Sequence, residues 1–218
     1  MNYCEEWLAS GGFEPWNAVT NLGFVLAAAW GWREFRRAGL MDRAAALALV
    51  ALAFAIGAGS YAWHATGAAW AQWADVLPIL CFVLIFLATA LRWLCGWSIA
   101  AGIGACVVVL AAAVAATLAY ARALNGSIAY VPVWLGLAGL TALLRQQRSP
   151  ARPAFALATL LFAVSLVFRT LDLALCEATQ HRGTHWLWHL CNSALLALLM
   201  QTLARHAPSR APAATIRP

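Results

Sequence analysis

Three histidines lie within stretches of sequence that are otherwise apolar. His185 and His189 are four residues apart near the start of the last apolar stretch, and His64 lies at the end of the second. Residues four apart lie on one face of a helix, one turn from each other, so this spacing allows both side chains to bind one metal ion. Catalytic zinc sites use three protein ligands and leave a fourth position for water. We therefore predict that His64, His185 and His189 bind zinc.

Two further polar residues stand close to this set. Ser60 precedes His64 by one helical turn, and Asp75 is expected to open the third apolar stretch on the same side of the molecule. A carboxylate beside a metal-activated water can take its proton and later hand it to a leaving group, and a hydroxyl can stabilise a developing oxyanion. We predict catalytic roles for Asp75 and Ser60.

Each of these residues also has a purely structural interpretation. A single buried histidine can bond to a helix carbonyl, an aspartate at a helix start can cap that helix, and a serine can bond back to its own helix. The metal site is favoured because ionisable groups in an apolar span are costly and because all three histidines fall at one depth.

The composition places these residues in a membrane. Of the 218 residues, 64% are apolar and only 10% are charged, which does not describe a soluble domain. Because an unpaired backbone amide is costly in lipid, apolar stretches of this length are expected to be helical. The chain is therefore predicted to be an all-α bundle of seven transmembrane helices. The expected spans are approximately residues 17–32, 44–63, 75–94, 98–120, 128–144, 153–175 and 184–205.

Domain organisation and orientation follow from the same pattern. Residues 1–206 are predicted to form one domain, and residues 207–218 a disordered cytoplasmic tail. The chain has no lysine, and its arginines follow the first, third, fifth and seventh spans, whereas only Arg122 and Arg182 lie in loops on the opposite side. The positive-inside rule then puts the amino terminus outside and the carboxyl terminus in the cytoplasm.

The net positive charge and the use of arginine also indicate the kind of partner and the source of the protein. The net charge of +6 is explained by cytoplasmic loops near anionic lipid headgroups, so no nucleic acid is expected. Arginine in place of lysine, with abundant alanine, indicates a bacterial protein. We expect an inner-membrane protein whose candidate site lies near the periplasmic side.

Several segments together resemble the alkaline ceramidase family. This family is part of a superfamily of seven-helix zinc hydrolases that includes adiponectin receptors, haemolysin-III-type proteins and lipid remodelers of GPI anchors. The resemblance extends over nearly the whole chain. It is carried by residues 57–66 (GAGSYAWHAT), Gln72, residues 75–78 (DVLP), residues 184–190 (THWLWHL), residues 14–17 (EPWN), Asn21, Arg169, Asp172 and Cys176.

The resemblance implies a reaction and roles for the candidate residues. It implies hydrolysis of the amide bond of ceramide-like lipids, with His64, His185 and His189 on zinc, Asp75 activating water and Ser60 assisting. Substrate would enter sideways from the bilayer, and a fatty acid and an amine lipid would leave. Ceramide or another N-acyl lipid is expected as the partner, and the oligomeric state stays open.

The amino-terminal segment is similar to the calcium-binding segment of animal ceramidases. The resemblance implies Ca²⁺ ligands at Asn2, Glu5 and Glu14, although Asn2 replaces an aspartate, Trp7 replaces an asparagine and Glu14 comes early. Calcium sites need six to eight oxygen ligands, so Glu6 or water would have to complete this one. The alternative is an acidic, solvated outside terminus.

Cysteine usage separates two residues from the other four. Cys4 and Cys176 both fall on the predicted outer side, where disulfides survive, and the matching family positions are bridged, so a bond between them is predicted. The other cysteines are interpreted as small packing residues. Arg169 and Asp172, three apart on one helix, could pair within the bundle.

Two other functions compete with the amidohydrolase. One keeps fold and metal but cleaves a lipid ester, as other members of the superfamily do. The other is a non-catalytic receptor or sensor in which zinc only joins helices. A proton or ion transporter is disfavoured, because the charged residues gather at one rim and no chain of them crosses the membrane.

Overall fold

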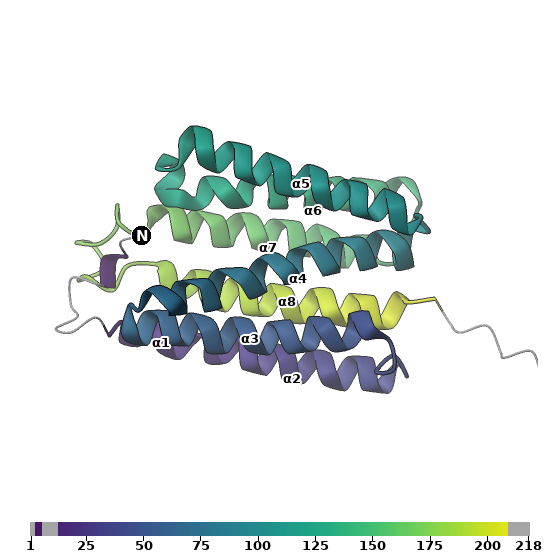
Figure 1. Ribbon diagram of the computed structural model, residues 1–218, viewed down its shortest axis with the longest axis horizontal. Helices are drawn as coiled ribbons and strands as arrows, with labels where there is room; N and C mark the ends of the chain where they lie inside the picture. Colours follow the sequence, from purple (N-terminus) through teal and green to yellow (C-terminus); the bar gives the residue numbers. More distant parts are fainter. Residues whose placement is uncertain (1–2, 6–12, 209–218) are drawn as a thin grey trace, which may run out of the picture.

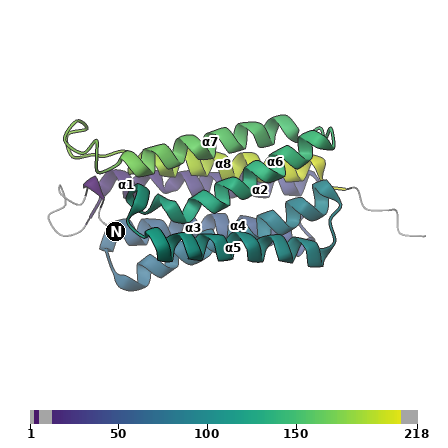
Figure 2. The same ribbon diagram turned by 90° about the horizontal axis from the view of Figure 1, so that it is seen from above.

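The computed structural model describes residues 3–5 and 13–208, and the elements of this part of the chain are helical (Figure 1). The helices run side by side along one long axis, as the second view also shows (Figure 2). Their bounds are α1 Pro15–Thr20, α2 Leu22–Arg37, α3 Ala44–Thr66, α4 Ala69–Cys95, α5 Ile99–Tyr120, the 3₁₀ helix η2 Ala123–Tyr130, α6 Val131–Gln146, α7 Arg152–Leu171 and α8 His185–His206.

Six helical segments are long and apolar enough to cross a membrane. They are α3, α4, α5, the joined segment of η2 and α6, α7 and α8. The first predicted span, residues 17–32, falls on α1 and α2, which meet at Asn21 and follow one another along the bundle (Figure 1). The fold thus fits an integral membrane protein.

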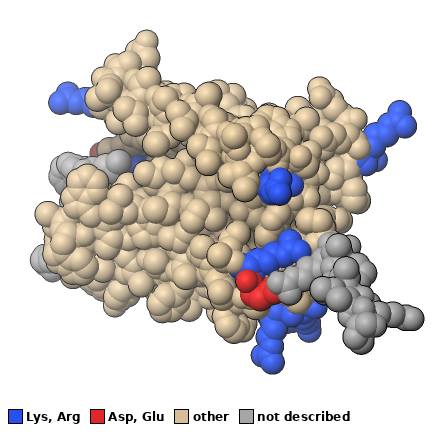
Figure 3. Space-filling view, turned by 45° about the vertical axis from the view of Figure 1, so that its right-hand side comes forward, with Lys and Arg blue, Asp and Glu red and all other residues tan. Residues whose placement is uncertain are grey.

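α8 lies in the centre of the bundle, whereas α5 lies at its periphery. α8 packs between α7 and α2, and its buried residues include Trp188, Leu195 and Leu203 (Figure 1). In α5, by contrast, Gly102 is the one buried residue, and apolar side chains such as Val108 are exposed. An apolar exposed helix is expected against lipid. Figure 3 shows charged side chains gathered toward the ends of the bundle on the face drawn.

The turn between α3 and α4 corrects the position expected for Asp75. Gly67 ends α3 with φ +60°, and its N–H donates to the Trp63 carbonyl at 2.8 Å. Glycine adopts this left-handed conformation without strain, so the chain reverses at once and α4 begins at Ala69. Asp75 therefore lies inside α4 and does not open it. The interpretation of Asp75 as a helix cap is wrong, since Ala68 is the N-cap.

Two other predicted spans differ from the structure at their ends. α7 ends at Leu171, four residues before the predicted end, and residues 172–181 form turns. The expected span over residues 128–144 begins within η2, where Leu124, Asn125 and Gly126 have positive φ. Apolar composition alone overlooked the end of α7, because the leucines and the alanine among residues 171–175 continue the apolar pattern past the helix end.

α3 and α4 approach each other closely at Gly59. A Cβ atom on Gly59 would overlap the carbonyl group of Ala74, so only glycine allows this contact. Pro78 lies four residues after Ala74 and has no N–H, which leaves that carbonyl without its usual helix partner. The contact brings the backbone of Asp75 directly against α3, next to Ser60.

Candidate metal centre

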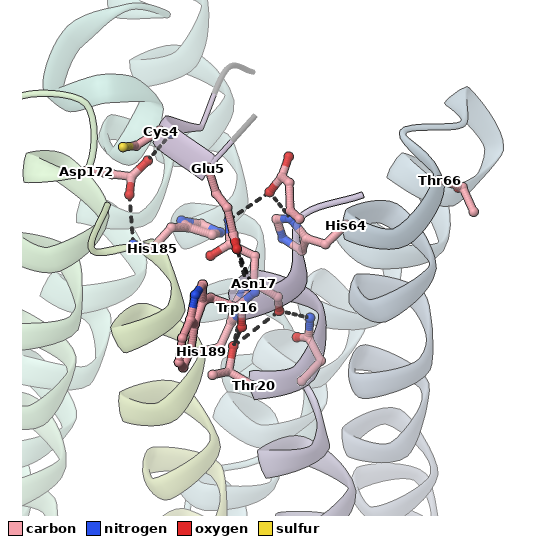
Figure 4. A network of polar contacts seen from close by, with 12 residues as sticks. Cys4, Glu5, Trp16, Asn17, Thr20, His64, Thr66, Asp172, His185 and His189 are labelled. Atoms are coloured by element: carbon pink, nitrogen blue, oxygen red, sulfur yellow. Dashed lines mark hydrogen bonds and ion pairs between the residues drawn. The ribbon is translucent and has the colours of Figure 1, made fainter. Parts of the chain in front are cut away.

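The three predicted zinc ligands converge at one end of the bundle. His64 comes from the last turns of α3, and His185 and His189 from the first turns of α8 (Figure 4). One ligand atom from each lies within 4.8 Å of the other two, and the three side chains are buried. Within residues 3–5 and 13–208 this is the one such group of three or more His, Cys, Asp or Glu side chains. We call this end of the bundle the histidine end.

Two ring nitrogens in the cluster have no hydrogen-bond partner among the described residues. They are Nε2 of His64 and Nδ1 of His185, and both are buried. A buried polar atom left without a partner costs free energy, and a metal ion would supply the missing interaction. Neutral imidazole nitrogens are good zinc ligands, so the donor set fits this ion.

Glu14 orients His64. Its carboxylate Oε2 lies 2.7 Å from Nδ1 of His64 and also accepts a hydrogen bond from Nδ2 of Asn17 at 2.7 Å. With Nδ1 donating to Glu14, the lone pair of Nε2 points to the cluster, an arrangement common behind zinc-binding histidines. Burial raises the pKa of Glu14 to about 7, while the bond from Asn17 opposes the rise. A cation held by the histidines would favour the charged carboxylate.

Thr20 plays the corresponding part for His189, and sequence reasoning missed it. The Thr20 hydroxyl donates to the Trp16 carbonyl at 2.8 Å and lies 3.0 Å from Nδ1 of His189. Because a hydroxyl has one hydrogen, Nδ1 of His189 donates to Thr20 and Nε2 is left for the metal. The signal was weak, since a threonine on the first helix carries no motif of its own.

Asp172 holds the start of α8. Its carboxylate accepts hydrogen bonds from the N–H groups of Thr184 at 2.7 Å, His185 at 2.8 Å and Cys4 at 2.9 Å. The first N–H groups of a helix lack partners within it, and Asp172 satisfies them from a distant segment. Gly183 has φ +63°, and a Cβ there would overlap the Asp172 carboxylate. His185 is placed by these contacts.

Arg169 lies against aromatic rings, and its pairing with Asp172 stays a prediction. Its guanidinium carbon is 5.3 Å from the ring centroid of Tyr130 and 5.6 Å from that of Trp188. The side chain is buried. Cation–π attraction between the guanidinium and the two rings helps to hold both rings in position.

The amino-terminal segment covers the histidine cluster. The predicted disulfide between Cys4 and Cys176 is confirmed, with a Cα–Cα distance of 5.3 Å. It anchors Tyr3, whose ring centroid lies 4.1 Å from that of His185 and 5.0 Å from that of His64. Burial raises the pKa of Tyr3, so the phenol keeps its proton. Tyr3 was not predicted, because its role depends on where Cys4 is tied.

The acidic residues assigned to calcium are bonded within this segment. Glu5 accepts hydrogen bonds from the N–H groups of Trp16 at 2.6 Å and Asn17 at 2.8 Å, which caps α1 (Figure 4). Burial raises the pKa of Glu5, and these two bonds oppose the rise. Because Glu5 and Glu14 are both buried, the interpretation as a solvated terminus is wrong for them. Asn2 lies outside the described residues, and calcium at Asn2, Glu5 and Glu14 stays a prediction.

Ser60 and Asp75 lie together beside the cluster. The Ser60 hydroxyl is within hydrogen-bonding reach of the Asp75 carboxylate, and Ser60 itself is buried. Asp75 is not one of the side chains in the group that could hold the ion. A carboxylate close to a metal site without being a ligand is free to act on a water molecule.

An apolar cavity begins beside the histidines and extends along the bundle. Phe24 and Trp188 line the part of the cavity nearest the histidines. The Phe24 ring lies 6.3 Å from that of His189, and the Trp188 ring lies 6.5 Å from that of His185. Such a cavity suits a hydrocarbon chain. Its other lining residues are Ile56, Ile79, Phe82, Val83, Phe86, Leu87, Val109, Tyr130, Val133, Gly136, Leu137, Leu140, Phe162, Asn192, Leu195, Leu196 and Leu199.

Fold and site together define a helical membrane protein with a candidate metal centre beside an apolar cavity. Residues 1–207 match the family model described as Ceramidase, and the chain belongs to this family. No curated protein matches the chain. The match confirms the predicted resemblance, and it supports a membrane hydrolase that acts on the amide of ceramide.

Proposed function

We propose that the protein is a zinc-dependent amidohydrolase that cleaves ceramide or a ceramide-like N-acyl lipid within the membrane. The observation that carries this proposal is the convergence of His64, His185 and His189, with two partnerless nitrogens, beside an apolar cavity. Family membership supports the amide bond as the target.

Zinc at this site would supply Lewis acidity, polarising the amide carbonyl and acidifying a water molecule. Asp75 takes a proton from the attacking water and returns it to the amide nitrogen as the carbon–nitrogen bond breaks. Ser60 has one hydroxyl hydrogen, and in this proposal it would donate that hydrogen to the nearby Asp75 carboxylate. In this account Ser60 orients the base, and its predicted bond to the oxyanion is replaced by that role. The products are a fatty acid and an amine lipid.

The membrane arrangement belongs to the same proposal. α1 and α2 together form the first of seven spans, and the histidine end faces outward. Support comes from the arginines Arg37, Arg92 and Arg205, which lie near the helix ends opposite the histidines, as the positive-inside rule requires for a cytoplasmic side. In a bacterium the site would lie near the periplasmic side of the inner membrane.

The test compares the purified wild-type protein with an Asp75→Asn variant on a labelled ceramide, with release of fatty acid as the readout. We expect the variant to keep its zinc and to lose about 10²- to 10⁴-fold in rate, the usual contribution of a general base. Chelation should abolish hydrolysis and added zinc should restore it. Unchanged hydrolysis in the variant would contradict the role of Asp75.

Two further outcomes separate the alternatives. If zinc removal unfolds the protein and neither wild type nor variant hydrolyses any lipid, the metal only joins helices and the protein is a receptor or sensor. If a matched ester is cleaved and the amide is not, the protein is a lipid ester hydrolase.

A further inference from the structure

Asn192 is a polar side chain in the wall of the apolar cavity. Apart from the rings of Tyr130 and Trp188, the other described residues that line the cavity have hydrocarbon side chains or are glycine. Asn192 is buried from solvent and lies on α8, the helix that carries His185 and His189. A buried carboxamide is costly unless its polar atoms have partners.

Two hydrogen bonds donated by its NH₂ group fix the orientation of the Asn192 amide. Nδ2 donates to the Trp188 carbonyl at 2.8 Å and to the Ser165 hydroxyl oxygen at 3.3 Å. Ser165 is fully buried and donates its own hydrogen to the Phe162 carbonyl at 2.9 Å, so it can only accept from Asn192. Both amide hydrogens are therefore used, and Oδ1 is the polar atom left for the cavity. No donor among the described residues is paired with it.

The position of Asn192 along α8 sets the distance between this oxygen and the metal ligands. Asn192 follows His189 by three residues and His185 by seven, so it lies on the same face of α8 as the metal ligands. Three residues advance a helix by about 4.5 Å. With carbon–carbon bonds of about 1.5 Å and tetrahedral angles, an extended chain covers this distance in about three or four bonds.

A bound water is a poor partner for Oδ1. A buried water typically needs two to four polar partners, whereas a cavity lined mainly by hydrocarbon side chains offers few of them. A hydroxyl carried by the lipid is held in place by its own chain and needs only that acceptor.

We propose that Asn192 Oδ1 accepts a hydrogen bond from a hydroxyl of the substrate lipid, three or four bonds from the scissile carbonyl. This inference rests on the proposed function and narrows it to hydroxylated N-acyl lipids. The hydroxyl belongs to whichever chain occupies the cavity, either the acyl chain or the chain of the amine. Ser165 positions the amide that receives it.

The experiment uses two pairs of lipids. In one pair the acyl chain carries or lacks a hydroxyl on its third carbon, and in the other the amine's chain carries or lacks its hydroxyl. For each lipid, kcat/KM and the rise in thermal unfolding temperature on binding are measured with the full chain in detergent. We expect wild type to favour the hydroxylated member of one pair by about fivefold to tenfold, the value of one hydrogen bond. The pair that shows the effect identifies the chain in the cavity.

Variants assign the preference to Asn192. Asn192→Leu, similar in size, should remove the preference, and Ser165→Ala should reduce it by loosening the amide. Ser193→Ala is the matched control, since its hydroxyl bonds to the Leu190 carbonyl and it does not line the cavity. Each comparison is made within one variant, so a loss of stability does not imitate the result.

The inference would be overturned if wild type showed the same kcat/KM and the same rise in unfolding temperature for both members of each pair. A preference that survives Asn192→Leu would overturn it as well. The binding readout keeps it separate from the proposed function. A protein that binds the hydroxylated lipid selectively but hydrolyses none supports the Asn192 subsite and contradicts the amidohydrolase.

Discussion

The histidine end and the cavity beneath it are held by different interactions. At the histidine end, side chains bond to backbone groups of distant segments, as Asp172 does to Cys4 and His185 and as Glu5 does to Asn17. The cavity wall consists mostly of hydrocarbon side chains, with the rings of Tyr130 and Trp188 and the carboxamide of Asn192. Hydrogen bonds fix position to within tenths of an ångström, whereas apolar packing tolerates changes of similar volume. Substitutions should therefore be costly at the first region and mild at the second.

Asp172→Ala should have the largest effect on stability. It leaves three backbone N–H groups without their acceptor, and we expect the free energy of unfolding to fall by about 4 kcal/mol. The start of α8 would loosen and metal binding by His185 would weaken. Chemical unfolding in detergent measures the loss, and Glu177→Ala, at an exposed position, is the control. Equal stability of the two variants would show that Asp172 does not hold this end together.

Replacing Cys4 and Cys176 by serine should come next. Loss of a disulfide that closes so long a loop typically costs about 3 kcal/mol, and Tyr3 would no longer be held over the histidines. The unfolding temperature and the rate of metal release to a chelator measure both effects. Cys81→Ser, which removes a free exposed thiol, serves as comparison and should change neither. Unaltered metal release in the double variant would exclude a role for the tether at the site.

Gly59→Ala should destabilise the contact between α3 and α4 by about 2 kcal/mol, because the added methyl overlaps the Ala74 carbonyl. Hydrolysis should fall as well, since Asp75 moves away from Ser60. Gly104→Ala on α5 meets no atom within 4 Å and should be neutral or slightly stabilising. The same unfolding and activity assays apply. If both glycine variants behave alike, the close approach does not position Asp75.

A substitution deep in the cavity should have the smallest effect on stability. Leu199 lies ten residues beyond His189, about 15 Å along α8. Leu199→Phe fills space there, so we expect a change below about 1 kcal/mol together with a shift toward lipids with shorter chains. Hydrolysis of a series of chain lengths measures the shift, and Leu190→Phe, on the exposed side of α8, is its control. An unchanged chain-length profile would place the hydrocarbon chain outside this cavity.

The sequence predicts well the features that depend on helix periodicity or on the family resemblance. Apolar stretches and the four-residue spacing of His185 and His189 depend on helix periodicity, so the helical bundle and the histidine cluster follow from them. The Cys4–Cys176 bond followed from the family resemblance. The bundle and the His185–His189 pair depend on local periodicity and the disulfide on the resemblance, and the structure confirms each of them.

The roles of Thr20, Tyr3 and Asp172 are not local. Each depends on a short segment folding back onto α3 or α8, and no spacing in the sequence encodes such contacts. The apolar pattern predicts a helix start at Asp75. The turn at Gly67 instead lets α4 begin six residues earlier. Prediction thus failed where contacts between distant segments decide the geometry.

Zinc K-edge X-ray absorption of the purified protein tests the metal centre most directly. The spectrum reports the ligand atoms and their distances. We expect about one zinc per chain, with three imidazole nitrogens at about 2.0 to 2.1 Å and one light oxygen ligand. Sulfur in the coordination shell, or a fully folded chain that holds no zinc when the ion is supplied, would contradict the assignment of His64, His185 and His189.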